Sequence, residues 1–423
     1  MLNIALSFLH AEPLVFSSAY DLALQNSNGI KAQVYSSQAD DEKINQEESQ
    51  LYPQIKLSGY YKKSEYTYND TARDTIRQGL FNATATLQQS VYNAEVYSRI
   101  NTQEARSEYS KFGVKVKKEE LAQEVFGSYL NLLKSKNKIK LYESYLSFNK
   151  AKLQELTRKY ELNLSNKMDL LEVKVDYNAA QIDLDREKKL YNVYDLKLKQ
   201  YIGDVDYELP TIDSDKSILD MIDTMKETVG NDKESLKVKQ AQVAIDISKG
   251  EMEIASDGHL PTVNLAGSYA KFDTDDPTID APYDSTKYLM LTVDIPIYSG
   301  GYVSSRVASS ELLHKAAQED LLRTKKEVRV EYNEYLALFE ASVDSVAMYK
   351  EALESAELYV ESVDQGYDHG LKSIVDLSDA KVRYFEVRYK YIENIYELVD
   401  SYIGLLIVTN SFGNIDILDR LVQ

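Results

Sequence analysis

The chain has 423 residues, no cysteine and a formal net charge of −19. The acidic balance argues against binding to nucleic acid, which needs a basic surface, and the lack of cysteine leaves neither a disulfide framework nor a thiolate nucleophile. Hydrophobic residues make up 43% and charged residues 28%, which is too apolar for a disordered chain and too polar for a helical membrane protein. Four scattered histidines lack metal-ligand spacing, so we expect no metal site and no cofactor.

The first eleven residues form a short apolar stretch that ends in a small residue, Ala11. They lack the basic segment of an export signal. Two interpretations are open: a signal peptide truncated by a misassigned start codon, or the apolar first turn of a helix. The context given below favours the truncated signal peptide over residues 1–11.

The sequence repeats itself at an interval of about 207 residues. The segment 51–59 matches 260–267, including a proline and a glycine, and Tyr160 and Asp169 fall on Tyr367 and Asp376. We therefore expect two structural repeats, 12–207 and 208–423, each with a helix, two strands, a very long helix, a short break and a long helix. Chance similarity between coiled-coil stretches is the alternative, and the matching proline and glycine argue against it.

Each repeat contains two stretches with the period of a β-strand, about 54–66 and 80–92 in the first and 262–273 and 287–298 in the second. Their apolar faces carry Phe81, Leu87, Leu289, Leu291, Val293 and Ile295. Lengths of about 10–13 residues suit tilted transmembrane strands. Four strands cannot close a barrel, so strands in lipid require the chain to oligomerise. Soluble hairpins that pack their apolar faces on a helix explain the pattern equally well.

Two helical hairpins are predicted, about 96–203 with a tip at 162–166, and about 302–410 with a tip at 366–373. The first helix of each has roughly 65 residues, which gives a rod of about 100 Å. Apolar spacings of three and four favour coiled-coil packing of these helices.

Two carboxylates follow the second tip, Asp376 and Asp379, and their spacing puts them on one helix face. Aspartate is also favoured at a helix N-terminus by capping and by the helix dipole. The residues alone leave both interpretations open, because a functional pair requires several copies to come together.

Three segments taken together resemble the TolC family of outer-membrane efflux and secretion channels. These are 256–265, with the sequence SDGHLPTVNL, 293–301, with VDIPIYSGG, and 366–380, where GYDHG precedes LKSIVDLSDA. Residues 42–45 and 51–54 of the first helical region are similar too. The resemblance covers the chain from about Glu12 onwards.

This resemblance implies a fold that is mainly α with a β-barrel part. Three protomers would each give four strands to one twelve-stranded barrel in the outer membrane, and the helices would continue as an α-helical tunnel through the periplasm. An equatorial girdle would use residues 203–235 and 410–423. The strand apolar faces would then meet outer-membrane lipid.

The resemblance also implies roles for single residues. Asp376 and Asp379 match an acidic pore constriction that would attract an inhibitory multivalent cation, and Tyr367, Lys372 and Asp169 match contacts that close the tunnel. The hairpin tips would contact an adaptor through Gly366, Gly370, Leu371, Asn163, Leu164 and Ser165. Asn163 stands where the second tip has Gly370, and asparagine tolerates the left-handed backbone such a turn needs.

The function implied is a homotrimeric exit duct of a tripartite efflux pump or a type I secretion system, rather than an enzyme. Its periplasmic tip would be opened by an adaptor, also called a membrane fusion protein, and an inner-membrane transporter. The alternative is a periplasmic coiled-coil adaptor or scaffold, which also has long hairpins. The sequence does not distinguish drug efflux from protein secretion.

Overall fold

The computed structural model describes residues 13–67, 75–210, 217–229, 235–274, 284–411 and 416–420. The expected signal peptide over 1–11 and parts of both expected girdle segments lie outside the described residues. The chain divides into two compact units: unit 1 is Met1–Gln33, Val114–Val238 and Lys325–Gln423, and unit 2 is Val34–Gly113 and Lys239–Thr324.

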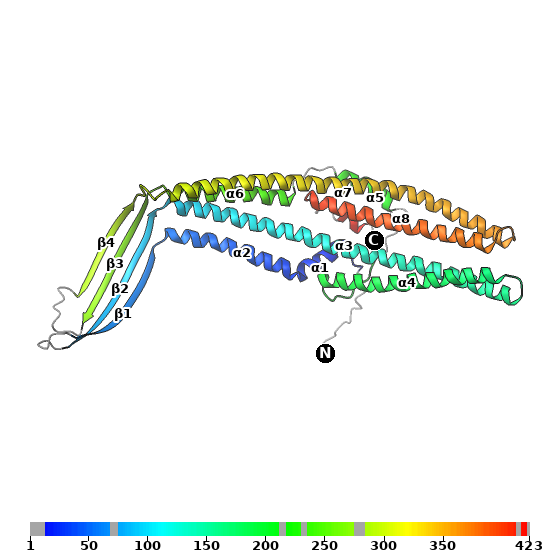
Figure 1. Ribbon diagram of the computed structural model, residues 1–423, viewed down its shortest axis with the longest axis horizontal. Coiled ribbons are helices and arrows are strands. Elements are labelled where there is room, and N and C mark those ends of the chain that lie inside the picture. The colour runs from blue at the N-terminus through cyan, green and yellow to red at the C-terminus, as the bar shows by residue number, and fades with distance from the viewer. Residues whose placement is uncertain are drawn as a thin grey trace, which may run out of the picture. The chain divides into compact units, whose positions relative to one another are not determined.

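The described chain is mainly helical, with one four-stranded sheet (Figure 1). The helices are α1 Phe16–Asn26, α2 Asn28–Glu48, α3 Ala94–Glu161, α4 Lys167–Ile202, α5 Ser217–Val229, α6 Leu236–Asp257, α7 Tyr302–Asp368, α8 Ile374–Val408 and α9 Asp416–Asp419, with a 3₁₀ turn, η1, at Ser49–Leu51. The strands are β1 Gln54–Tyr66, β2 Ile76–Tyr92, β3 Thr262–Thr274 and β4 Ser285–Asp294. None of the described helices combines the length and the apolar character needed to cross a membrane.

The sheet is antiparallel with the strand order β1-β2-β3-β4. Directly opposed residues share a face, and the register pairs Leu57 with Ala85, and Leu265 with Leu291. As a result one face gathers the apolar side chains of all four strands: Ile55, Leu57, Phe81, Leu87, Val263, Leu265, Leu289, Leu291 and Val293. The opposite face carries mostly polar side chains such as Ser58 and Thr86.

Two strand ends differ from the sequence expectation. β2 begins at Ile76 rather than at 80, because Glu65 and Tyr66 at the end of β1 pair with Arg77 and Ile76. β4 ends at Asp294, so Ile295 lies beyond the strand and the expected strand over 287–298 is too long. Asp294 pairs with Thr262, and the next position would face Pro261, which has no N–H to donate.

The helices of unit 2 meet largely through polar contacts. Ser98 on α3 donates to Asp257 on α6 at 2.5 Å, and Gln103 on α3 donates to the carbonyl of Asp40 on α2 at 3.1 Å. Gly250 on α6 allows a close approach, since a Cβ there would lie 2.2 Å from the hydroxyl of Thr102.

Unit 1 holds the apolar core. The ring of Phe16 on α1 packs edge-on against Tyr129 on α3, with centroids 4.8 Å apart, and the Tyr129 hydroxyl donates to the carbonyl of Leu14. The last turns of α8 are buried from Ser401 to Val408. Within them Gly404 lies against α7, where an added Cβ would come within 2.3 Å of a tyrosine ring.

A buried carboxylate lies on α3 in the same unit. Glu119 is 9% exposed, and its Oε1 has no hydrogen-bond partner among the described residues. Burial raises the pKa of Glu119 to about 7; the positive charge of Lys237 opposes this rise, and the negative charge of Glu331 adds to it. Those two residues pair with each other at 3.0 Å. Glu119 therefore changes charge near neutral pH.

Candidate functional site

The candidate site is formed by the two hairpin tips in unit 1 (Figure 1). Each tip turns on one residue with a left-handed backbone, Asn163 with φ 58° and Gly370 with φ 71°. The amide of Leu164 donates to the carbonyl of Lys159 at 2.7 Å, and the amide of Leu371 donates to that of Gly366 at 2.8 Å. Both helix ends are thereby closed by backbone bonds.

An exposed leucine follows each left-handed residue. Leu164 is 73% exposed and Leu371 is 81% exposed. Leu162 and Met168 beside the first tip are exposed as well. Large apolar side chains gathered at exposed turns indicate a contact surface for another molecule.

The helix that follows each tip is capped at its N-terminus by a side chain. Asn166 accepts a hydrogen bond from the amide of Asp169 at 2.9 Å, and the Ser165 hydroxyl lies 3.4 Å from the same aspartate. At the second tip Ser373 and Asp376 form a reciprocal capping box: Ser373 accepts from the Asp376 amide at 3.1 Å, and the Ser373 amide donates to Asp376 Oδ2 at 2.8 Å.

The capping interpretation therefore holds for Asp376. Hydrogen bonds from the amide and hydroxyl of Ser373 lower the pKa of this carboxyl, with a smaller contribution from the charge of Lys372. Only Oδ2 accepts the capping bonds, and Oδ1 has no hydrogen-bond partner among the described residues. Asp379 is exposed on the next turn. The capping role thus leaves the carboxylate ionised, with an oxygen available to a cation.

A charged cluster joins the two hairpins just behind the tips. The Tyr367 hydroxyl on α7 donates to Glu155 Oε1 on α3 at 2.7 Å, and Lys159 Nζ donates to the same hydroxyl at 2.9 Å. The ammonium groups of Lys152 and Lys159 lie 4.3 and 5.0 Å from the centre of the Tyr367 ring. We call these four residues, Lys152, Glu155, Lys159 and Tyr367, the tip latch.

The contacts within the tip latch stabilise the charged forms of Glu155 and Lys159. Partial burial raises the pKa of Glu155, but hydrogen bonds from Lys159 and Tyr367 and the charge of Lys152 outweigh this and lower it to about 2. The hydrogen bonds with Glu155 and Tyr367 raise the pKa of Lys159 to about 12. Both groups therefore stay charged across the neutral range.

An apolar cluster lies beneath the latch. It is formed by buried side chains of α3, α4, α7 and α8: Leu156, Val173, Val360, Val363, Ile374, Leu377 and Ala380. Beside it the Ser378 hydroxyl on α8 donates to Asp176 Oδ2 on α4 at 2.9 Å. Near the tips the hairpins are thus joined by apolar packing, by the tip latch and by this hydrogen bond.

The residues expected to close the tunnel do not meet one another in this chain. Tyr367 bonds to Glu155 and Lys159, which the sequence analysis did not single out, whereas Asp169 bonds within its own turn. Lys372 packs across the second turn, where a Cβ at Gly366 would lie 2.8 Å from its Cγ. Among the described residues no three acidic or histidine side chains are placed to hold a metal ion.

A family model described as "Outer membrane efflux protein" matches residues 19–204 and 232–411. The chain belongs to this family.

Curated relatives agree with this family. The outer membrane protein TolC of Vibrio cholerae is 22% identical over 393 residues, or 90% of this chain and 88% of that protein. TolC of Escherichia coli is 24% identical over 84% of this chain and 75% of its own length. The proteases secretion protein PrtF of Dickeya chrysanthemi is 20% identical over 98% of this chain and 92% of its own length.

Solved structures share the fold. CusC matches with a TM-score of 0.79 at 14% identity, covering 94% of this chain and 92% of that one. The outer membrane protein VceC of Vibrio cholerae matches with a TM-score of 0.78 at 12% identity, covering 93% and 95%.

Membership of the outer membrane efflux protein family makes the chain a transport protein of the bacterial outer membrane rather than an enzyme. It also sets aside the alternative of a periplasmic adaptor or scaffold, which the long hairpins alone would allow. The capped, leucine-bearing tips and the tip latch therefore belong to an outer-membrane transport protein.

Proposed function

We propose that three copies of this chain form one channel-tunnel through the outer membrane. Each copy contributes β1 to β4 to a twelve-stranded barrel, and the helical hairpins continue this barrel as a tunnel into the periplasm. The observation that carries the proposal is the sheet: its apolar face is exposed and its outer strands β1 and β4 each pair on one side only within the described residues.

The energetics of the sheet support lipid and a second copy as its surroundings. Leu57 is 78% exposed and Leu289 is 72% exposed. Burying one such side chain is worth about 1.5–3 kcal/mol, and the apolar face holds several. An open strand edge in lipid leaves N–H and C=O groups unpaired at several kcal/mol each, so a neighbouring copy must cover β1 and β4.

The tips form the gate of the proposed channel. Within one protomer the tip latch holds the two hairpins together, and Lys372 and Asp169 add contacts between neighbouring hairpins. Threefold symmetry gathers Asp376 and Asp379 into a ring of carboxylates at the entrance. Such a ring favours cations and gives an inhibitory multivalent cation its site.

The proposed partners act on the exposed tips. A periplasmic adaptor contacts Leu164, Leu371 and the turn residues around them, and an inner-membrane transporter supplies the energy that parts the latch. The relatives named for outer-membrane function and for protease secretion support an exit duct that serves either a tripartite efflux pump or type I secretion.

Disulfide trapping tests the trimer, and because the chain has no native cysteine, only the introduced cysteines can form disulfides. Ser58→Cys on β1 is combined in turn with cysteine at Thr286, Tyr288, Met290 or Thr292 on the same face of β4. We expect at least one pair to give covalent dimers and trimers in outer membranes after mild oxidation. Thr86→Cys on central β2, combined with the same set, is the matched control and should give none. The absence of covalent oligomers for every β1–β4 pair contradicts the proposal.

A further inference from the structure

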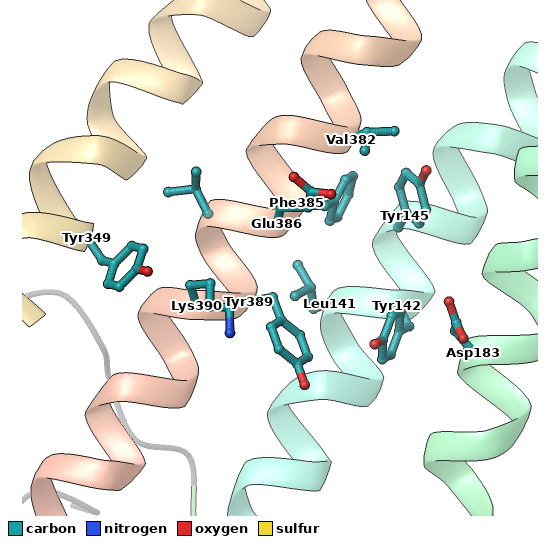
Figure 2. Close-up of a pocket in the computed structure, with 11 residues that line it drawn as sticks. Leu141, Tyr142, Tyr145, Asp183, Tyr349, Val382, Phe385, Glu386, Tyr389 and Lys390 are labelled. Carbon is teal, nitrogen blue, oxygen red and sulfur yellow. The ribbon is translucent and has the colours of Figure 1, made fainter. Parts of the chain in front are cut away.

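Away from the tips, unit 1 contains a cavity of about 600 Å³ between its helical hairpins (Figure 2). Its walls come from α3, α4, α7 and α8 and are rich in aromatic rings: Tyr142, Tyr145, Tyr349, Phe385 and Tyr389. This volume lies within the range of about 300–1,000 Å³ typical of sites for small organic ligands. The gating contacts of the tips do not involve these residues.

Ring packing between the two hairpins gives the cavity a defined wall. The centroids of Tyr145 on α3 and Phe385 on α8 are 4.4 Å apart, and the rings are inclined by 55°. Tyr389 already holds a cation, because Lys138 Nζ lies 4.2 Å from its ring centre and donates to its hydroxyl at 2.5 Å. Tyr349 and Tyr142 approach the cavity from opposite sides (Figure 2).

One lining carboxylate differs from the other in its charge environment. The charged groups of the lining are Asp183, Glu386 and Lys390, and Asp183 is paired with Arg186 at 3.0 Å. Lys390 is paired with Glu393 at 3.1 Å, whereas Glu386 has no ion-pair partner among the described residues. Burial, with the charges of nearby residues including Asp183, raises the pKa of Tyr142 to about 12, so its hydroxyl is neutral.

We propose that this cavity binds an organic monocation that carries an aromatic ring system, with its charge beside Glu386 and its rings against Tyr142 and Tyr349. Tyrosine rings attract cations through their faces, and an unpaired carboxylate adds charge complementarity. A bare metal ion lacks enough oxygen ligands here, and an organic anion would meet the unpaired carboxylate of Glu386.

Such a ligand touches both hairpins at once. It therefore binds the packed arrangement of the hairpins more tightly than one in which they separate, and linkage requires it to stabilise that arrangement. This consequence rests on the proposed function, because there it means that the ligand favours the closed channel. Binding itself depends only on the cavity.

Fluorescence anisotropy of ethidium with the purified full chain in detergent tests the site. A ligand of about 24 non-hydrogen atoms at ordinary efficiency gives a Kd on the order of 10 µM. Tyr349→Leu should raise the Kd about three- to fivefold, because the tyrosine ring no longer packs against the cationic ring system of the ligand. Glu386→Gln should raise it about two- to fivefold and reduce its dependence on salt.

Two variants on α7 outside the cavity serve as matched controls. Tyr359→Leu and Glu357→Gln remove the same kinds of side chain, and we expect neither to change the Kd. Equal affinity for all four variants and the wild type, or equal binding of anionic fluorescein, would show partition into detergent and overturn the site. If the trimer is intact but ethidium does not bind, the proposed ligand site is refuted and the channel is not. If disulfide trapping fails but ethidium binds, the proposed trimeric channel is refuted and the ligand site is not.

Discussion

Removing one hydroxyl from the tip latch should loosen the hairpins. Tyr367→Phe deletes the hydrogen bonds to Glu155 at 2.7 Å and from Lys159 at 2.9 Å but keeps the ring beside Lys152. A hydrogen bond to a charged group contributes about 1.5–3 kcal/mol, and solvent screening favours the lower end because the Glu155 side chain is 35% exposed. We expect a loss of about 1.5 kcal/mol per chain, which is roughly tenfold in the equilibrium between packed and parted hairpins.

Single-channel recording in planar bilayers without partner proteins measures this shift. The open fraction should rise about tenfold or more in Tyr367→Phe. It should rise further when Lys372→Ala is added. The control is Tyr384→Phe, whose hydroxyl only accepts a bond from Arg388 one turn along the same helix at 2.8 Å. An unchanged open fraction in the Tyr367→Phe/Lys372→Ala double variant, with trimers intact, refutes the gating role of the tips.

The latch also has a defined pH range. The pKa of Glu155 is lowered from 4.5 to about 2, so its stabilising effect is complete above the ordinary value and is lost as the pH falls toward 2. The pKa of Lys159 is raised from 10.5 to about 12, so its effect is complete below 10.5 and is lost as the pH rises toward 12. The contribution of the latch to the wild-type open fraction should therefore be constant between about pH 5 and 10.

Three other changes have expected outcomes. Asp376→Ala with Asp379→Ala should abolish block by a trivalent cation added from the tip side, measured as conductance; retained block places the cation elsewhere. Glu119→Gln should stabilise the protein at pH 8 by about 3 kcal/mol in thermal unfolding, because the folded pKa is raised from 4.5 to about 7. This gain should fade as the pH falls from 7 toward 4.5, and a pH-independent gain contradicts the assignment. Gly404→Ala should cost at least about 2 kcal/mol by overpacking, whereas Gly127→Ala, which meets nothing within 4 Å, should be neutral or stabilising in the same assay.

The sheet could be predicted because its physics is local. Alternation of apolar and polar residues identifies a strand and its faces without knowledge of its neighbours. The strand ends depend on the partner strand: β2 extends back to Ile76 because β1 reaches Tyr66, and β4 stops at Asp294 because Pro261 cannot continue the ladder. The alternation of apolar residues over 287–298 predicts that Ile295 belongs to the strand, but this alternation carries no information about the neighbouring strand β3.

The tips were predictable in part. The left-handed turns at Asn163 and Gly370 follow from residue type, and the Ser373 cap follows from its spacing to Asp376. The latch partners of Tyr367 were missed because Glu155 lies 212 residues away and looks like any other charged position on a long helix. No local pattern distinguishes a glutamate that faces solvent from one that faces a second hairpin.

The contacts of the tip latch and the hydrogen bonds between paired strands differ in strength, and this difference indicates where the proposed channel can open. The latch consists of partly exposed polar and charged side chains, and each of their contacts is worth on the order of 1 kcal/mol, so a partner with ordinary binding energy can break them one after another. Parting two strands in lipid exposes a whole row of N–H and C=O groups at several kcal/mol each, which no peripheral contact can offset. Opening must therefore occur at the tips while the strands stay paired. A disulfide that joins β1 to β4 of a neighbouring copy should leave gating intact, whereas one that joins Leu164→Cys to Leu371→Cys of any copy should prevent opening until it is reduced.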